Sequence, residues 1–244
     1  MFLPENNLMK IGGLQKLTLI DFPNTLACTV FLSGCNFRCP WCYSPELVLP
    51  EYIKLQPEIK EADFFDFLKS KKGLLDGAVI CGGEPTIHSE LPLFCSKIKN
   101  LGYKVKLDTN GSNPEMLEKL FKQKLVDYAA MDIKAPKESY PKTVGFGGAS
   151  GYYLVDKIEK SIALLKNGNV DYEFRTTIVP GVHTQEDVIK IANWIKPAKK
   201  YFLQNFRPEK TLDPNFEAYS PFEEKEMYQI KECIAPFFDI SQVR

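Results

Sequence analysis

The sequence predicts an α/β fold, and more specifically a partial (β/α)6 barrel in which parallel strands alternate with helices. Short apolar stretches rich in β-branched residues alternate along the chain with longer amphipathic stretches of helical periodicity. The 244 residues suffice for one domain with a well-buried core, and neither an internal repeat nor an obvious linker interrupts them. Polar or glycine-rich motifs directly follow the strand-like stretches, which is where the chemistry of such barrels is located.

The barrel strands are expected where apolar runs are short and end in turn-forming residues. They are residues 26–32, 77–81, 104–107, 128–133, 172–179 and 200–206. Helices are expected in the amphipathic stretches, at residues 56–71, 89–100, 114–124, 156–167, 184–195 and 221–235. Pro114 suits the first turn of its helix, and Thr184 suits an N-cap. The remaining segments are interpreted as a lead-in strand and turn (10–23), a long loop (135–151) and an extended tail (238–243).

The whole chain, residues 1–244, is interpreted as a single domain with a core at about 12–206 and a C-terminal helical extension at 207–244. Hydrophobic residues make up 44% of the chain and charged ones 25%, which is typical of a soluble globular protein. The 31 Lys and Arg residues balance 31 Asp and Glu, so charge gives no reason to expect nucleic acid as a partner. No apolar run is long enough to span a membrane, and the first residues lack a secretory signal pattern.

The seven cysteines are an odd number, and three of them lie in one loop. This arrangement does not resemble a disulfide framework and favours a reducing compartment, so we expect a cytoplasmic protein. Cys28, Cys81, Cys95 and Cys233 are isolated in sequence, and we expect each to be a small buried apolar residue.

The loop GCNFRCPWC places Cys35, Cys39 and Cys42 in a C-x3-C-x2-C spacing. Thiolates are soft ligands that suit iron–sulfur clusters, zinc or copper. An ordinary ferredoxin cluster takes four cysteines, so three would leave one iron of a cubic cluster open to bind a substrate. Two alternatives remain: a helical stripe of buried cysteines, which Pro40 disfavours, and a zinc site completed by His88, for which a second short-spaced pair is missing.

Two motifs follow neighbouring strands. Gly82, Gly83 and Glu84 come directly after one strand, where two glycines let the backbone approach a ligand closely and the carboxylate adds an acceptor for an ammonium group. A turn with a solvated Glu is the alternative. Asp108 and Thr109 end the next strand ahead of an Asn-Gly turn, and Asp108 could instead cap that turn.

Asp132 and Lys134 stand two residues apart at the end of a strand, so both side chains point to one face. A charged pair that faces a barrel interior is costly unless it binds something, and the alternative is a pair that faces solvent beyond the strand. His88 and His183 have no partner pattern for acid–base catalysis and are interpreted as ordinary loop or helix-start residues.

The cysteine spacing, with Trp41 just before the last cysteine, resembles the signature of the radical S-adenosylmethionine enzymes. The run LACTVFLSGCNFRCPWCYSPEL, residues 26–47, resembles more narrowly the activating enzymes of glycyl-radical enzymes, and among them the activating proteins of anaerobic ribonucleotide reductase. One departure concerns the residues after the third cysteine, which are Tyr43-Ser44-Pro45-Glu46 where many such enzymes have His-Asn-Pro-Glu.

The resemblance implies a radical S-adenosylmethionine type of barrel, one [4Fe–4S] cluster on the three cysteines, and S-adenosylmethionine as cofactor. Trp41 is then placed near the adenine, Gly82, Gly83 and Glu84 at the amino group, and Lys134 at the carboxylate. The other implied cofactor contacts are Asp108, Thr109, Asp132, Arg175 and Gln204. Arg175 could instead pair with a neighbouring acid.

The activity implied by the resemblance is reductive cleavage of S-adenosylmethionine to a 5′-deoxyadenosyl radical, which generates a glycyl radical on a partner enzyme. The expected partners are anaerobic ribonucleotide reductase and a low-potential electron donor such as flavodoxin or ferredoxin. Two alternatives stay open. One is a radical S-adenosylmethionine enzyme that acts on a deazapurine precursor or modifies another protein, and the other is a non-catalytic cluster- or zinc-binding sensor.

Overall fold

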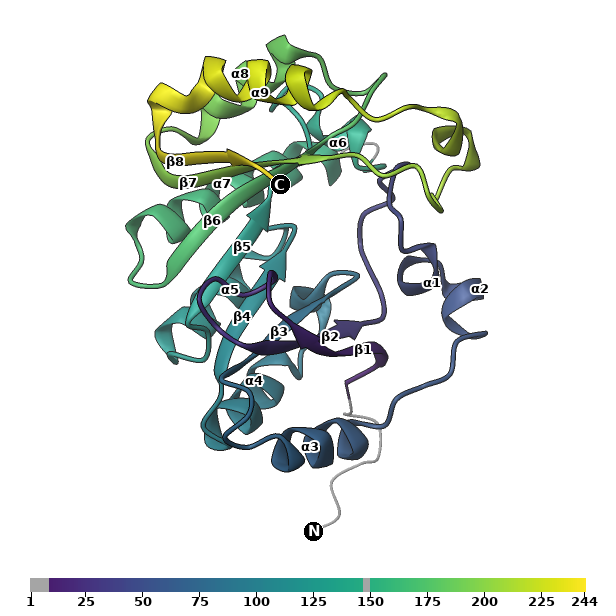
Figure 1. Cartoon of the computed structure of the whole chain (residues 1–244), viewed down its shortest axis with the longest axis vertical. Helices are drawn as coiled ribbons and strands as arrows, with labels where there is room; N and C mark the ends of the chain where they lie inside the picture. The colour runs from purple at the N-terminus through teal and green to yellow at the C-terminus, as the bar shows by residue number, and fades with distance from the viewer. Residues whose placement is uncertain (1–8, 147–149) are drawn as a thin grey trace. The chain divides into compact units, whose positions relative to one another are not determined.

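The computed structural model of the chain describes residues 9–146 and 150–244. Within them the strands form one eight-stranded sheet in the order β1 to β8 (Figure 1). The first strand, β1 (Ile11–Thr18), pairs antiparallel with β2 (Ala27–Leu32). The pairs β2–β3, β3–β4, β6–β7 and β7–β8 are parallel. Strands that alternate with helices in a mostly parallel sheet confirm the predicted α/β class.

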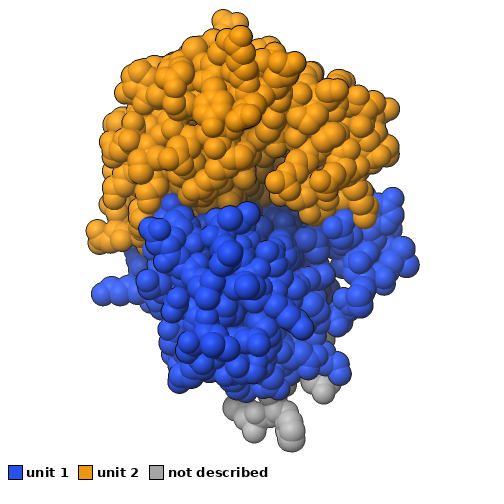
Figure 2. All heavy atoms as spheres, in the orientation of Figure 1, with its two compact units in different colours: residues 1–36, 46–109, 115–129 blue, residues 37–45, 110–114, 130–244 orange. Residues whose placement is uncertain are grey.

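The chain forms two compact units, which are coloured separately in Figure 2. The first unit comprises Met1–Asn36, Glu46–Thr109 and Glu115–Ala129. Its strands after β2 are β3 (Gly77–Gly82) and β4 (Lys104–Thr109), and β2 and β3 are buried along most of their length. The helices in this part of the chain are α1 (Pro45–Val48), α2 (Pro50–Ile53), α3 (Glu61–Ser70), α4 (Leu91–Asn100) and α5 (Pro114–Lys122). The rings of Phe64 and Phe94 stack at 5.4 Å and join α3 to α4.

The second unit comprises Phe37–Pro45, Asn110–Pro114 and Ala130–Arg244. Strand β5 (Tyr128–Asp132) ends in it, and β6 (Asp171–Ile178), β7 (Ala198–Asn205) and β8 (Phe238–Val243) belong to it. Its helices are α6 (Tyr140–Thr143), α7 (Ser150–Asn167), α8 (Gln185–Ile195) and α9 (Glu224–Ile234), with short 3₁₀ turns at Pro214–Ala218 and Ala235–Phe237. Thr184 caps α8 as predicted, in a reciprocal capping box with Asp187.

Several segments differ from the sequence prediction: α1 and α2 were not predicted, and α9 begins at Glu224 rather than at residue 221. Helix α3 begins at Glu61 rather than at residue 56, because Ile59 bridges to Ile11 of β1 in an extended conformation and Pro57 disfavours a helix before it. The predicted loop 135–151 contains the short helix α6, whose Tyr140 is fully buried, and α7 already begins at Ser150. Residues 147–149 of that loop lie outside the described residues.

The isolated cysteines divide into buried and exposed ones. Cys28 and Cys95 have no exposed surface and Cys81 is half-buried, but Cys233 is exposed, so the prediction was wrong for Cys233. The reason is the helical period of α9, because Met227, Ile230 and Ile234 supply its buried face and Cys233 lies outside that stripe. Among the described residues, none of the helices is long and apolar enough to cross a membrane.

Candidate functional site

The glycine motif after β3 packs directly against the beginning of the cysteine loop. Gly82 has a φ of +118°, which favours glycine, and a Cβ added to Gly83 would lie 1.9 Å from the carbonyl oxygen of Gly34. The next residue, Glu84, donates its backbone N–H to the same carbonyl at 2.7 Å. Both glycines are therefore required for the backbone of this motif to meet the residue that precedes Cys35.

The Glu84 carboxylate is a buried acceptor at the ends of two strands. Its side chain has 1% exposure, and its Oε1 accepts hydrogen bonds from the backbone N–H and hydroxyl of Thr86. The hydroxyl of Thr109, at the end of β4, donates to the same oxygen at 2.7 Å. The structure thus brings Glu84 and Thr109 together within the first unit, as expected for residues that follow adjacent parallel strands.

Asp108 pairs with a lysine that the sequence analysis did not single out. Lys106 lies two residues earlier on β4 and has only 1% exposure, and its ammonium group forms an ion pair with Asp108. Residues two apart on a strand share a face, so the same spacing argument that selected Asp132 and Lys134 could have found Lys106. A buried ammonium group needs such a partner, which ties the orientation of Asp108 to Lys106.

Asp132, Lys134 and Arg175 form a connected charge cluster in the second unit. The carboxylate of Asp132 receives Lys134 Nζ at 3.0 Å and Arg175 Nε at 2.9 Å, and the three side chains are 23%, 18% and 12% exposed. The alternative that Arg175 pairs with a neighbouring acid is therefore what the structure shows. Two cations share one carboxylate, so these three groups by themselves carry a net charge of +1 (2 − 1 = 1).

The electrostatics of these side chains keep both Asp132 and Lys134 charged. Burial opposes ionisation of Asp132, but the charges of Arg175 and Lys134 outweigh it and hold the pKa of Asp132 well below its ordinary range. Burial also opposes the charge on Lys134, whereas Asp132 and then Cys39 raise the pKa of Lys134 well above its ordinary value.

Segments distant in sequence hold the cysteine loop inside the second unit. The backbone N–H of Arg38 donates to the carbonyl of Val144 at 2.8 Å. The backbone N–H groups of Leu212 and Asp213 donate to the carbonyls of Cys42 and Pro40 at 2.8 and 2.9 Å. These bonds give both the 135–151 segment and the chain beyond β7 a role in shaping the loop.

The three loop cysteines are thiols in the structure, as are the other four. Cys39 is buried and Cys35 and Cys42 are half-buried, and Cys35 belongs to the first compact unit whereas Cys39 and Cys42 belong to the second. Across residues 9–146 and 150–244, no three His, Cys, Asp or Glu side chains are gathered in a metal-binding arrangement. The donor set itself, three thiols in one short loop, fits a cluster with one open iron, and the assignment of these ligands stays a prediction.

Trp41 and His183 meet inside the second unit. Trp41 is 4% exposed, and its ring lies edge-on to the His183 ring at 5.7 Å between centroids. His183 is 3% exposed, and both of its ring nitrogens lie within hydrogen-bond distance of backbone atoms, at Val179 and Lys134. The interpretation of His183 as an ordinary residue missed these contacts, because nothing near it in sequence indicates them.

The end of β7 adds two further polar groups. Gln204 is half-buried and pairs in register with Thr177 of β6. Asn205 donates to the carbonyl of Phe222 at 2.7 Å, and its buried Oδ1 has no hydrogen-bond partner among the described residues. Register alone therefore places Gln204 beside β6, and its expected contact to the cofactor stays a prediction.

A second arginine, Arg244, directly follows β8, and the sequence analysis did not identify it. The guanidinium group of Arg244 contacts both carboxylate oxygens of Glu173, at 3.0 and 3.3 Å, and lies 3.5 Å from the ring centroid of Phe202. Glu173 is fully buried and lies two residues before Arg175 on β6, hence on the same face.

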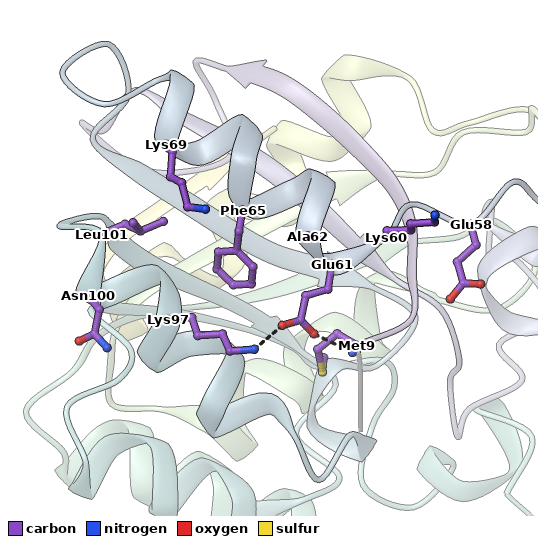
Figure 3. Close-up of a pocket in the computed structure, with 10 residues that line it drawn as sticks. All are labelled: Met9, Glu58, Lys60, Glu61, Ala62, Phe65, Lys69, Lys97, Asn100 and Leu101. Atoms are coloured by element: carbon purple, nitrogen blue, oxygen red, sulfur yellow. Dashed lines mark hydrogen bonds and ion pairs between the residues drawn. The ribbon is translucent and has the colours of Figure 1, made fainter. Parts of the chain in front are cut away.

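A large surface cavity of about 750 Å³ lies elsewhere, between α3 and α4 in the first unit (Figure 3). Glu61 lines the cavity, pairs with Lys97 at 2.6 Å and accepts a hydrogen bond from the backbone N–H of Met9 at 3.0 Å. The residues that line the cavity are Met9, Glu58, Lys60, Glu61, Ala62, Phe65, Lys69, Lys97, Asn100 and Leu101. None of them belongs to a strand-end motif, so the size of this cavity does not identify the site.

The fold, the cysteine loop and the strand-end motifs together define a radical S-adenosylmethionine type of protein, and comparison with known proteins agrees. Residues 29–195 match the model of the radical SAM superfamily. The chain therefore belongs to the radical SAM superfamily, whose members use a [4Fe–4S] cluster and S-adenosylmethionine.

Two relatives in sequence extend this result. Over 235 residues the chain is 34% identical to "Putative glycyl-radical enzyme activating enzyme MJ1227" of Methanocaldococcus jannaschii, which covers 96% of this chain and 95% of the relative. It is 33% identical over 163 residues to 7-carboxy-7-deazaguanine synthase of Aquifex aeolicus, which covers 66% of this chain and 62% of that protein.

Solved structures resemble the fold at low sequence identity. Streptococcus suis SuiB bound to its precursor peptide SuiA matches with a TM-score of 0.66 at 13% identity, over 88% of this chain and 48% of that one. A radical SAM methyltransferase from Sphaerobacter thermophilus matches with a TM-score of 0.65 at 13% identity, over 93% of this chain and 68% of that one. The chain thus spans about half of the SuiB structure, and at this identity the likeness concerns the fold alone.

Proposed function

We propose that this protein activates a glycyl-radical enzyme by generating a glycyl radical on it. The observation that carries the proposal is the similarity to the M. jannaschii relative named as such an activating enzyme, which extends over nearly the full length of both chains. A pyruvate formate-lyase-activating enzyme from Clostridium pasteurianum is also similar, at 27% identity over 84% of this chain.

The cluster would be held by Cys35, Cys39 and Cys42. When bound, the cluster and S-adenosylmethionine would supply the radical chemistry that removes a hydrogen atom from the substrate glycine. The chain's own residues bind and orient the cofactor. Lys134 and Arg175, which both pair with Asp132, would present their cationic groups to the cofactor carboxylate.

The amino group of the cofactor would be received by the glycine motif. Gly82 and Gly83 let the backbone approach it closely, and the buried carboxylate of Glu84 offers an acceptor whose position is fixed by Thr86 and Thr109. Four further residues would complete the polar and aromatic surroundings of the cofactor: Trp41, Asp108, Thr109 and Gln204.

The proposed partner is anaerobic ribonucleotide reductase, with a low-potential flavodoxin or ferredoxin as electron donor in the cytoplasm. The support is the resemblance of residues 26–47 to the activating proteins of that reductase. A second candidate function is synthesis of a deazapurine, because the A. aeolicus 7-carboxy-7-deazaguanine synthase matches two thirds of the chain at 33% identity.

The test begins with anaerobic reconstitution of the full chain with iron and sulfide. Reduction in the presence of S-adenosylmethionine should form 5′-deoxyadenosine, and Cys39→Ala should abolish both cluster and product. Addition of a candidate glycyl-radical enzyme should then produce the doublet of a glycyl radical in electron paramagnetic resonance. Turnover of a small deazapurine precursor without any protein partner would favour the second candidate. A protein that binds zinc in place of a cluster would refute the enzymatic proposal.

A further inference from the structure

His183 occupies the turn between β6 and α8, directly before the N-cap Thr184. It is 3% exposed although most loop residues that precede a helix face solvent. Its ring lies between three segments that are far apart in sequence: the cysteine loop, the chain after β5 and the end of β6. A buried imidazole with three such contacts requires an explanation beyond the start of a helix.

The hydrogen bonds of His183 determine its tautomer. The backbone N–H of Val179 donates to Nδ1 at 3.1 Å, so Nδ1 carries no proton. The proton then resides on Nε2, which donates to the carbonyl oxygen of Lys134 at 2.9 Å. Burial lowers the pKa of His183, which is consistent with this neutral form. The ring thus connects the turn after β6 to the main chain of Lys134.

The third contact of His183 reaches the cysteine loop. The ring of Trp41 meets the imidazole edge-on, at 5.7 Å between centroids and an angle of 76°, an arrangement that aromatic pairs favour. Trp41 stands between Cys39 and Cys42, and Lys134 pairs with Asp132, which also binds Arg175. The His183 imidazole therefore contacts both the cysteine loop, through Trp41, and the segment that carries Asp132 and Lys134.

We propose that His183 is a positioning residue, which fixes the Trp41 ring and the Lys134 main chain relative to each other so that both can engage S-adenosylmethionine. This inference rests on the proposed function, because it assigns Trp41 to the adenine and Lys134 to the carboxylate. It adds a residue that would not touch the cofactor. Removal of His183 should loosen both contacts without removing a cluster ligand.

Three variants of His183 separate its contributions, and a neighbouring residue supplies the control. His183→Phe keeps a ring against Trp41 but deletes both hydrogen bonds, His183→Ala deletes all three contacts, and His183→Gln retains one acceptor and one donor. Thr184→Ala removes the exposed N-cap of α8 and tests whether disturbing the start of that helix is sufficient. All variants are made in the full chain.

The first readout needs neither cluster nor activity. The chain has two tryptophans, so Trp194→Phe leaves Trp41 as the only one, and acrylamide quenching then reports how well Trp41 is shielded. His183→Ala should increase the quenching constant, and Thr184→Ala should leave it unchanged. Equal quenching in His183→Ala and the parent would overturn the proposed hold on Trp41.

The second readout is the dissociation constant of S-adenosylmethionine from the reconstituted protein, measured by equilibrium dialysis at matched iron content. His183→Phe should raise the dissociation constant roughly tenfold, because the net free energy of about one hydrogen bond corresponds to a factor of this size. His183→Gln should lower the constant part of the way back to that of the parent protein. An unchanged constant in His183→Phe, or an equal rise in Thr184→Ala, would overturn the proposal. If the parent protein itself binds no S-adenosylmethionine, the proposed function fails, while the quenching result still decides whether His183 positions Trp41.

Discussion

Replacement of Asp132 by Asn should destabilise the protein because it leaves two neighbouring cations without their shared counter-charge. Asn has nearly the same volume as Asp, so no cavity contributes. Asp132 binds Arg175 and Lys134 at 2.9 and 3.0 Å, and all three side chains are less than a quarter exposed. Loss of one partner of a fully buried ion pair lowers the free energy of unfolding by about 3–5 kcal/mol. Because these three side chains are partly hydrated, we expect a smaller loss of about 2–4 kcal/mol.

The assay is urea unfolding of the cluster-free chain under reducing conditions, followed by circular dichroism and by tryptophan fluorescence. Coincidence of the two transitions is required before a free energy of unfolding is derived. A loss of about 2–4 kcal/mol corresponds to a fall in melting temperature of roughly 4–16 °C for a chain of this size. The matched control is Asp66→Asn, whose ion pair with Lys69 is mostly exposed and should matter little.

A double variant provides a stricter test of the same reasoning. If the penalty arises from uncompensated positive charge, Arg175→Met added to Asp132→Asn should restore part of the lost stability rather than lower it further. The pH dependence has a definite sign, because the pKa of Asp132 is held below its ordinary value of 3.8. The contribution of the Asp132 carboxylate to stability is fully present above pH 3.8 and is lost as the pH falls below this value. The reasoning is refuted if Asp132→Asn destabilises no more than Asp66→Asn, or if the two substitutions in the double variant simply add.

Three further predictions concern other parts of the chain. Gly83→Ala should prevent stable cluster incorporation, measured as bound iron, since its Cβ would lie 1.9 Å from a carbonyl oxygen of the cysteine loop; normal iron content would contradict the close approach. Lys106→Met should lower the midpoint of urea unfolding, because it removes the buried ammonium group that pairs with Asp108, and breaking a buried ion pair costs about 3–5 kcal/mol. Iodoacetamide at pH 8 should label Cys233 quickly and Cys95 only on unfolding, because burial raises the pKa of the Cys95 thiol from 9.0 to about 12. Because the pKa of the Cys95 thiol is higher in the folded chain than in the unfolded chain, its contribution to stability is fully present below pH 9 and is lost as the pH rises towards 12.

Several features of this protein follow from the sequence alone because their causes are local. The start of α8 depends on Thr184 and Asp187, which are three residues apart, and the prediction of that helix was confirmed. The ends of the buried strands were found to within two residues, since apolar β-branched runs followed by glycine or polar residues act over a short window. The cysteine spacing and the motifs after the strands are likewise contiguous, and they were sufficient to indicate the superfamily.

Only the tertiary structure decided which of these residues meet. Arg175 and Asp132 are 43 residues apart, His183 and Lys134 are 49 apart, and no periodicity links the members of either pair. Arg244 contacts Glu173 across 71 residues because β8 adds to the sheet next to β7. Such contacts arise where parallel strands end at one edge of a sheet, and their partners depend on strand order and register rather than on neighbours in the chain. The sequence therefore determined the chemistry that is available, and the fold determined how its charges are paired.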